Sequence, residues 1–194
     1  GTVQADTRGN LVAQIRGEIV KESEAFRAGG SFSKGEVLLE IDPRDYAAEL
    51  SQASAAVSQA DAAYRQEQAN ARQARNDWDR LGNTGDAPEL VLRKPQLAAA
   101  KAQLESASAR LETAQLNLER TKITAPYDGR IIQRNAVLGQ YVGIGTPVAE
   151  IFSTDRVEVR LPLSQTEFTQ LGLDGAFSGD SAERFKVTLS SRVG

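Results

Sequence analysis

The sequence predicts an α+β protein in which a small β domain is interrupted by a long antiparallel coiled-coil hairpin. The first observation is a pair of apolar heptad stripes within residues 43–121, separated by a short segment that contains two glycines and a proline. The second is that the strand-like segments before and after this region carry glycines at matching intervals. Together they predict one β domain with a helical insertion.

The composition argues against several classes of function. Cys, His and Met are all absent, so the soft metal ligands and the commonest general base are missing. We therefore expect no catalysis, no metal and no bound cofactor, and the net charge of −3 gives no reason to expect nucleic acid. The sequence contains no run of about 18 apolar residues, which is the pattern that would predict a membrane span. Because the strand-like run at 185–189 stops without a closing element, we expect a longer protein, trimmed here at both ends.

The first 42 residues are predicted to form short strands. Leu11, Ala13 and Ile15 alternate with polar residues and indicate one buried face. Two further strand-like runs, 17–22 and 37–41, are separated by a polar turn that contains glycines. This pattern predicts a compact, turn-rich β unit.

The outgoing helix is predicted to begin at Asp42-Pro43, because Asp is a favoured N-cap and Pro is favoured at the first helical position. Its stripe contains one polar residue, Glu67. A stripe this narrow over about five heptads is typical of a two-stranded coiled coil. The stripe comprises Tyr46, Leu50, Ala53, Val57, Ala60, Tyr64, Glu67, Ala71, Ala74, Trp78 and Leu81.

The return helix has leucines seven residues apart, with alanines at the intermediate positions of the seam. We expect the periodicity to restart at Leu90 after the 82–88 turn. Pro95 either marks the true start of this helix, after a looser turn over 88–93, or kinks its first turn. At 1.5 Å per residue, each helix extends on the order of 50 Å. The seam residues are Leu90, Leu97, Leu104, Leu111, Leu118, Ala100, Ala107 and Ala114.

The two β segments are related as an internal repeat. Setting Gly35 against Gly145 also places Gly29 on Gly139, and two extra residues upstream bring 17–20 onto 129–132. The hairpin is therefore an insertion between two copies of one β unit. A further β region follows, with an alternating strand from Val157 to Leu163, a short helix after Ser164 and a strand at 185–189.

Three motifs carry a resemblance to a known family: residues 39–46 at the entry to the hairpin, 118–129 at its exit, and 142–147 beyond it. In this order they resemble the periplasmic adaptor proteins, or membrane fusion proteins, of tripartite efflux pumps of the resistance-nodulation-division (RND) type. The resemblance implies a lipoyl-like β-sandwich split by the hairpin. Residues 1–42 and 122–154 are its halves, 43–121 the hairpin and 155–194 a partial β-barrel domain, to which the N-terminal strand can also belong.

The function that the resemblance implies is that of a non-catalytic adaptor. It links an inner-membrane efflux transporter to an outer-membrane channel, assembles as a ring, expected to be hexameric, and is periplasmic, tethered to the inner membrane by an N-terminal segment absent from this chain. An adaptor of an ABC-type exporter or type I secretion system is the alternative within the family. From other classes, a freestanding coiled-coil module or a lipoyl or biotinyl carrier domain stays open. The hairpin occupies the place of a carrier's modified lysine, and the absence of soft ligands argues against metal efflux.

The end of the hairpin is the predicted docking site, because it is the part of a long rod that can reach a partner. The family carries an Arg, a Leu and a Ser on the two flanks of this turn. Leu81 matches the Leu, Arg75 or Arg80 the Arg, and Arg93 stands at the Ser position in a longer turn. The predicted docking residues are Arg75, Trp78, Arg80, Leu81, Arg93 and Lys94. The competing interpretations are that the cations only keep the helix ends hydrated and that Trp78 is buried in the seam.

Overall fold

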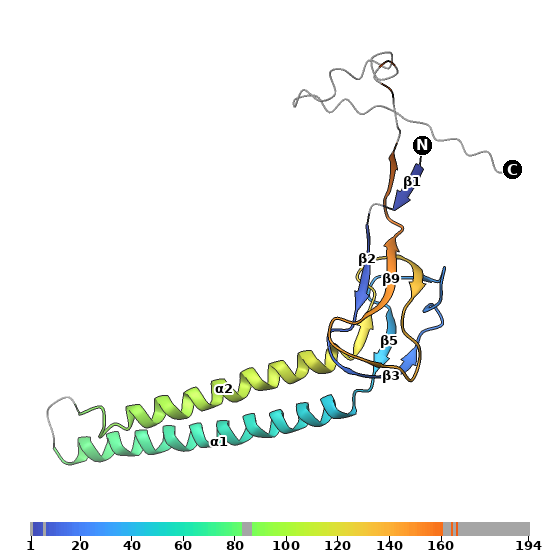
Figure 1. The fold of residues 1–194 in the computed structure, drawn as a ribbon. Helices are drawn as coiled ribbons and strands as arrows, with labels where there is room; N and C mark the ends of the chain where they lie inside the picture. The colour runs from blue at the N-terminus through green and yellow to red at the C-terminus, as the bar shows by residue number, and fades with distance from the viewer. Residues whose placement is uncertain (1, 6, 83–86, 161–163, 165, 167–194) are drawn as a thin grey trace. The chain divides into compact units, whose positions relative to one another are not determined.

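The computed structural model describes residues 2–5, 7–82, 87–160, 164 and 166 (Figure 1). The chain divides into two compact units, residues 1–5 with 157–194 and residues 6–156. In the first unit, β1 (Thr2–Ala5) pairs antiparallel with β10 (Val157–Arg160). The predicted strand at 185–189 lies outside the described residues, as does the predicted short helix apart from Ser164 and Thr166.

The larger unit contains two four-stranded antiparallel sheets. Their strand orders are β2-β9-β7-β4 and β6-β5-β3-β8, so each sheet takes strands from both sides of the hairpin. The strands are β2 (Arg8–Val12), β3 (Gly17–Glu22), β4 (Ser31–Phe32), β5 (Val37–Ile41), β6 (Lys122–Thr124), β7 (Gly129–Arg134), β8 (Tyr141–Val142) and β9 (Pro147–Ser153).

The internal repeat is confirmed by the strands and by the backbone. β3, β4 and β5 correspond to β7, β8 and β9 at the predicted offsets. Gly29 and Gly139 have φ of 78° and 79°, and Gly35 and Gly145 have 82° and 81°, a conformation that glycine adopts without steric cost. The short strands pair across the repeat, β4 with β7 and β8 with β3. Each half therefore completes a sheet of the other.

The core lies between the two sheets and is built from both halves. Leu38 and Val148, which are equivalent in the repeat, are both fully buried. The cluster that they belong to comprises Ala13, Ile15, Ile19, Phe26, Phe32, Leu38, Leu39, Ile41, Ile123, Ala125, Ile131, Ala136, Val142, Val148, Ala149 and Ile151. Because the two copies share one core, neither can bury its apolar face alone.

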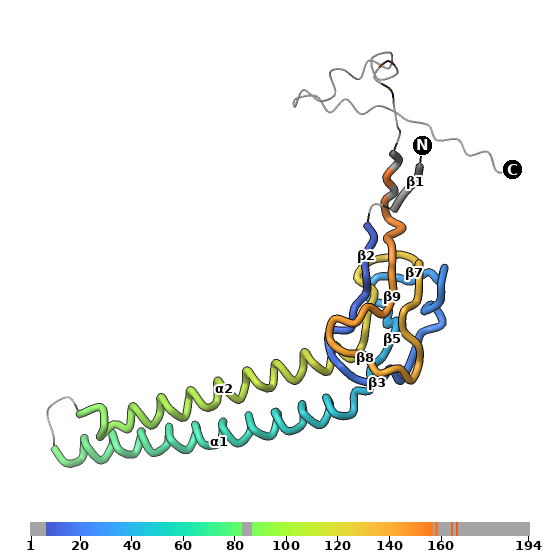
Figure 2. Tube along the Cα trace, viewed as in Figure 1, coloured from blue at the N-terminus to red at the C-terminus, as the bar shows by residue number. Residues whose placement is uncertain are grey.

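The hairpin consists of α1 (Arg44–Arg80) and α2 (Lys94–Glu119), which run side by side in opposite directions (Figure 2). The buried residues of these helices are Ala60, Ala107 and Ala114, all at predicted seam positions. Small side chains at the seam allow two helices to approach closely. The predicted coiled-coil hairpin is confirmed. Of the helices that the structure describes, none is both long and apolar enough to cross a membrane.

The base of the hairpin is fastened to the sheets by hydrogen bonds. The amide of Ile41 donates to the carbonyl oxygen of Thr121 at 2.8 Å, which joins the two ends of the insertion. The hydroxyl of Tyr46, in the first turn of α1, donates to the carbonyl oxygen of Arg16 at 2.8 Å. The first turn of the hairpin is therefore held by the β domain.

The predicted start of α1 is displaced by one residue. Pro43 occupies the N-cap position and Arg44 is the first helical residue, so Asp42 lies just outside the helix. Its carboxylate still accepts a hydrogen bond from the amide of Arg44, 3.1 Å from Oδ1. Hydrogen bonds from the side chain and the amide of Arg44 hold the pKa of Asp42 below its ordinary value of 3.8. Asp42 is therefore not the predicted N-cap, although its carboxylate accepts the amide of the first helical residue.

Of the two alternatives for Pro95, the structure adopts the later start of the helix. α2 begins at Lys94 and Pro95 is its second residue, where its lack of an amide proton costs no helical hydrogen bond. The predicted restart of the periodicity at Leu90 is wrong, because Leu90 lies in the preceding turn and its side chain is 72% exposed. The packed leucines of α2 begin at Leu97.

Candidate functional site

The end of α1 is closed by a glycine. Gly82 has a φ of 72° and donates its amide to the carbonyl oxygen of Asp79 at 3.3 Å, while the amide of Leu81 donates to Asp77 at 3.2 Å. A left-handed glycine after the last helical turn is a common helix stop. The stop leaves the side chain of Leu81 78% exposed.

A single helical turn precedes α2. The amide of Leu92 donates to the carbonyl oxygen of Pro88 at 3.1 Å, and the amide of Lys94 donates to Glu89 at 3.0 Å. Arg93 ends this turn with a φ of 55°, the one positive φ among the described non-glycine residues. The turn leaves Leu90 and Val91 exposed.

Arg93 and Glu67 form an ion pair that holds this turn against α1. Arg93 Nε lies 2.6 Å from Glu67 Oε1, and Arg93 Nη2 lies 3.1 Å from Glu67 Oε2. The hydrogen bond from Arg93 is the main reason why the pKa of Glu67 lies below its ordinary value of 4.5, and Asn70 adds a second donor. This pair explains why one seam position of α1 is acidic. Sequence reasoning missed it, although an acid in the seam facing a cation before the return helix was a usable signal.

The predicted docking residues divide into two groups in the structure. Arg75, Arg80, Leu81 and Lys94 are exposed, and Lys94 also pairs with Glu89 at 3.1 Å. Trp78 is half-buried, and Arg93 is half-buried and committed to Glu67. Their role in docking remains a prediction.

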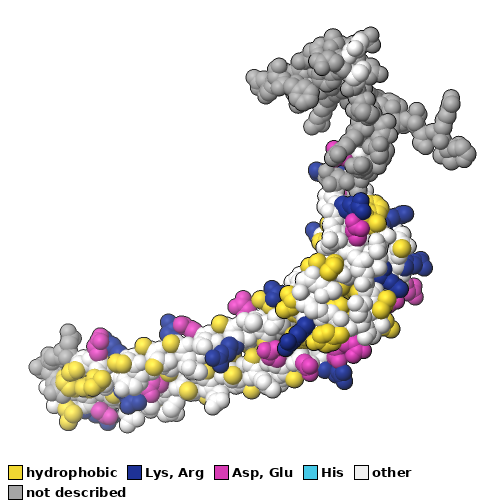
Figure 3. Space-filling model, viewed as in Figure 1, with side chains coloured by type: hydrophobic (Ala, Val, Ile, Leu, Met, Phe, Trp, Pro, Cys, Tyr) yellow, Lys and Arg dark blue, Asp and Glu magenta, His cyan; other side chains and the backbone are white. Residues whose placement is uncertain are grey.

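Exposed apolar side chains at this end include two that sequence reasoning did not select. Leu90 and Val91 are exposed together with Leu81. Figure 3 shows hydrophobic side chains gathered at the end of the hairpin. Leucines that are this exposed on a turn contribute to a contact surface and not to the core. We call Leu81, Leu90 and Val91 the apolar tip.

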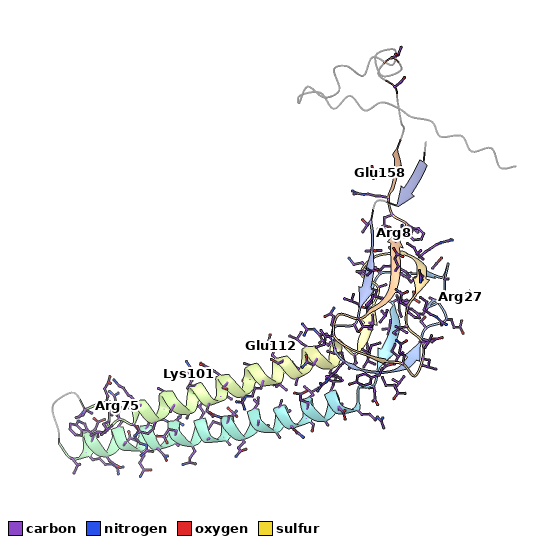
Figure 4. All side chains as sticks on the ribbon, in the orientation of Figure 1. Arg8, Arg27, Arg75, Lys101, Glu112 and Glu158 are labelled. Atoms are coloured by element: carbon purple, nitrogen blue, oxygen red, sulfur yellow. The ribbon has the colours of Figure 1, made fainter. Side chains whose placement is uncertain are left out.

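A groove of about 420 Å³ opens on one flank of the hairpin beside the tip. Its floor is apolar and its polar side chains are cations and one amide. Arg75, labelled in Figure 4, lines the groove from α1, and Lys94 lines it from the start of α2. The lining residues are Gln68, Ala71, Arg72, Arg75, Leu92, Lys94 and Leu97. We call this the basic groove.

The fold defines a class of protein, in which a two-sheet β domain is built from a repeat and interrupted by a coiled-coil hairpin. The exposed apolar tip provides a contact surface at the far end of this hairpin. The family model described as the barrel-sandwich hybrid domain of RND MFP, the membrane fusion proteins, matches residues 8–154. The chain therefore belongs to the membrane fusion protein family.

Solved structures share this fold. A candidate efflux transporter from Bacteroides eggerthii DSM 20697 is 23% identical, with a TM-score of 0.63 over 88% of this chain and 47% of that chain. A MacA-MexA chimera that contains the α-hairpin domain of Pseudomonas aeruginosa MexA is 25% identical, with a TM-score of 0.60 over 86% of this chain and 55% of that chain. The chain thus spans about half the length of these proteins.

A curated relative covers less. An uncharacterised protein of Haemophilus influenzae is 33% identical over 76 residues, which are 38% of this chain and 19% of that protein. This match is too short to carry an assignment of function. The family assignment rests on the match over residues 8–154.

Proposed function

We propose that this chain is the hairpin-bearing part of a periplasmic adaptor that links an inner-membrane RND efflux transporter to an outer-membrane channel. The observation that carries the proposal is the apolar tip, at the end of a hairpin whose helices are 37 and 26 residues long. Burial of such exposed apolar side chains under a partner's surface contributes favourable binding free energy. The adaptor catalyses no reaction of its own, and it physically connects one protein to another.

The wider assembly belongs to the same proposal. Copies of the adaptor associate into a ring, hexameric in the complete pump, and the hairpins extend from the ring toward the channel. An N-terminal segment outside this chain tethers the protein to the inner membrane. Support comes from membership of the membrane fusion protein family and from the α-hairpin fold shared with the solved structures.

A second candidate is an adaptor for an ABC-type exporter or a type I secretion system. The turn at the tip, which is longer than the family pattern and has Arg93 where that pattern has a serine, favours a channel other than the usual one. Copurification of the natural full-length protein after crosslinking in cells distinguishes the two, because the transporter recovered is either an RND pump or an ATPase.

The test of tip docking is a double substitution in the full-length protein. Leu81→Asp with Leu90→Asp places two charges on the apolar tip, and we expect dye efflux from the cells to be lost. The matched control is Leu116→Asp, because Leu116 is an exposed leucine in the last turns of α2, far along the helix from the tip. Intact efflux in the double variant, with normal protein level and helix content, would overturn docking through the tip.

A further inference from the structure

The shaft of the hairpin has two flanks, one on each side of the seam between α1 and α2. Gln68 and Arg75 lie on one flank, because both line the basic groove together with Lys94. A residue two positions away along a helix points about 200° away around it. Gln66 and Gln73, two residues before Gln68 and Arg75, therefore lie on the opposite flank. The chemistry of the two flanks is different.

The flank that contains the basic groove carries most of the charges of the shaft. Two of its ion pairs join successive helical turns, Arg65 with Asp61 at 2.8 Å and Lys101 with Glu105 at 3.6 Å. Figure 4 labels three of its residues, Arg75, Lys101 and Glu112. We call it the charged flank. Within 50–76 its charged residues are Asp61, Arg65, Arg72 and Arg75, and within 96–118 they are Lys101, Glu105 and Glu112.

The opposite flank repeats glutamine at heptad spacing. On α2, Gln96 and Gln103 lie two residues after Lys94 and Lys101 of the charged flank, and so they point to the other side. Their amides donate and accept hydrogen bonds and carry no net charge. We call this the amide flank. Its exposed glutamines are Gln52, Gln59, Gln66 and Gln73 on α1 and Gln96 and Gln103 on α2.

The charges of the amide flank lie at its two ends, apart from Arg110. Arg110 follows Gln103 by seven residues and is exposed in the middle of the shaft. Glu67 lies at the seam, where Arg93 pairs with it at 2.6 Å. The charges at the ends are Asp45, Glu49 and Arg120 at the base and Asp77 and Arg80 at the tip.

The glutamines of the two helices form one continuous surface. The ion pair near the tip and the hydrogen bond of Ile41 with Thr121 at the base fix the register of α1 against α2. In this register Gln59 and Gln103 lie at about the same height on the same flank. The uncharged surface therefore crosses from one helix to the other.

The outer edges of the shaft, which point away from the seam, are built from alanine. Such small side chains let the helices of two neighbouring copies approach closely. When the hairpins of a ring stand edge to edge, one flank of each faces the enclosed passage and the other faces outward. The exposed alanines of these edges in the middle of the shaft are Ala55, Ala62 and Ala69 on α1 and Ala102 and Ala109 on α2.

We propose that the amide flank lines the passage enclosed by the ring of hairpins and that the charged flank faces outward. This inference rests on the proposed function, which supplies the ring. In a ring, each side chain recurs in every copy at one height, so inward charges form rings that hold or repel charged solutes. Neutral amides let solutes pass without strong binding. Arg110 gives the passage one ring of positive charge, which favours anionic over cationic solutes.

Thiol labelling of the assembled complex tests which flank is enclosed. This chain has no cysteine, so single cysteines report one position each, with the unsubstituted full-length protein as background. The probes are Gln59→Cys and Gln103→Cys on the amide flank, and the matched control is Lys101→Cys, two residues from Gln103 on the charged flank. Each complex, recovered after amine-specific crosslinking in cells, is treated with N-ethylmaleimide or with a polyethylene glycol maleimide of several kilodaltons.

We expect the small reagent to modify all three cysteines and the large reagent to modify only the one at position 101. Modification of positions 59 and 103 by the large reagent at the rate of position 101 would overturn the proposal, because the flank would then be open to the outside. Resistance of positions 59 and 103 to the small reagent would also overturn it, since the flank would then be a contact surface.

Charge reversal at Arg110 supplies a second arm in cells. Arg110→Glu turns the predicted positive ring negative, so the export of an anionic dye relative to a cationic dye should fall at least about threefold. Both dyes are chosen because the unsubstituted protein supports their export. Lys101→Glu makes the same change in net charge on the charged flank, and there the ratio should not change. Equal ratios in the two variants, at normal protein level and helix content, would contradict an inward Arg110.

The two proposals fail separately. If neither a transporter nor a channel is recovered with the crosslinked protein, the adaptor function is wrong and the passage with it. If both are recovered and the cysteines of the two flanks react alike, the adaptor function stands and only the assignment of the flanks is wrong.

Discussion

Arg93 and Glu67 are 26 residues apart in the sequence and form a two-point ion pair, with Nε 2.6 Å from Oε1 and Nη2 3.1 Å from Oε2. Glu67 lies at a seam position of α1, and its side chain is only 14% exposed. Arg93 adopts a left-handed backbone conformation immediately before α2. The pair therefore fixes the point at which the chain turns back into the coiled coil.

Removing the charge of Glu67 should loosen this turn. In Glu67→Gln, Arg93 loses its charged acceptor while the size of the side chain is kept, so we expect faster amide hydrogen exchange over 88–97. Amides of the β domain should be unaffected. Glu105→Gln, which removes an exposed pair with Lys101, is the control. Equal exchange in the two variants would show that the ion pair does not hold the turn.

The same pair should make the hairpin end sensitive to acid. Because the pKa of Glu67 lies below 4.5 in the folded hairpin, the pair contributes its full stabilisation above pH 4.5 and loses it as the pH falls through the lowered pKa. The protection factors of the amides over 88–97, which correct for the slower intrinsic exchange at low pH, should therefore fall at acid pH. In Glu67→Gln this fall should be absent, and a fall of the same size in the variant would assign the effect to other carboxylates.

Gly82→Ala should destabilise the end of α1. The φ of 72° at this position costs a residue with a Cβ about 1–2 kcal/mol, although the surrounding space is open. We expect earlier thermal fraying of the last turn, measured by hydrogen exchange at Asp77 to Leu81. Gly9→Ala is the control, since Gly9 also has open space and lacks a positive φ. Similar behaviour of the two variants would remove the glycine stop as an explanation.

The shared core of the repeat should make its two halves unfold together. Leu38→Ala should cost about 2–5 kcal/mol, and Val148→Ala less because fewer atoms are removed. We expect each substitution to lower the unfolding midpoint of both sheets, followed by hydrogen exchange in β3 and β7. Leu116→Ala, at an exposed site, should change the stability by no more than about 0.5 kcal/mol. Unfolding of only the mutated half would contradict one common core.

Much of this fold could be predicted from spacing alone. The predicted hairpin, 43–121, differs from the observed helices by one or two residues at its outer ends. The repeat was visible because its turns need glycine, and Gly35 and Gly145 adopt the same positive φ. Heptad spacing and turn chemistry are local properties, so a single sequence contains them.

The tip could not be predicted in the same way. Leu90 stands seven residues before Leu97 and fits the heptad, but a proline at 95 prevents the helix from extending back through Val91, whose carbonyl its ring would meet. Heptad spacing indicates which residues lie on one face of a helix, and it does not indicate the residue at which the helix begins or ends. The ion pair of Arg93 likewise does not follow from the spacing of one helix, because its partner Glu67 lies in α1.

The hairpin enters and leaves the β domain through β5 and β6, which are paired neighbours, with Leu39 opposite Ile123 and Glu40 opposite Lys122. Both ends of the insertion are therefore fixed at one place, whatever length of chain lies between them. Adding one heptad to each helix would lengthen the rod by about 10 Å while leaving every strand in register. The β domain thus holds both ends of a hairpin whose length can change, so insertions of whole heptads during evolution could let the same β domain span gaps of different width.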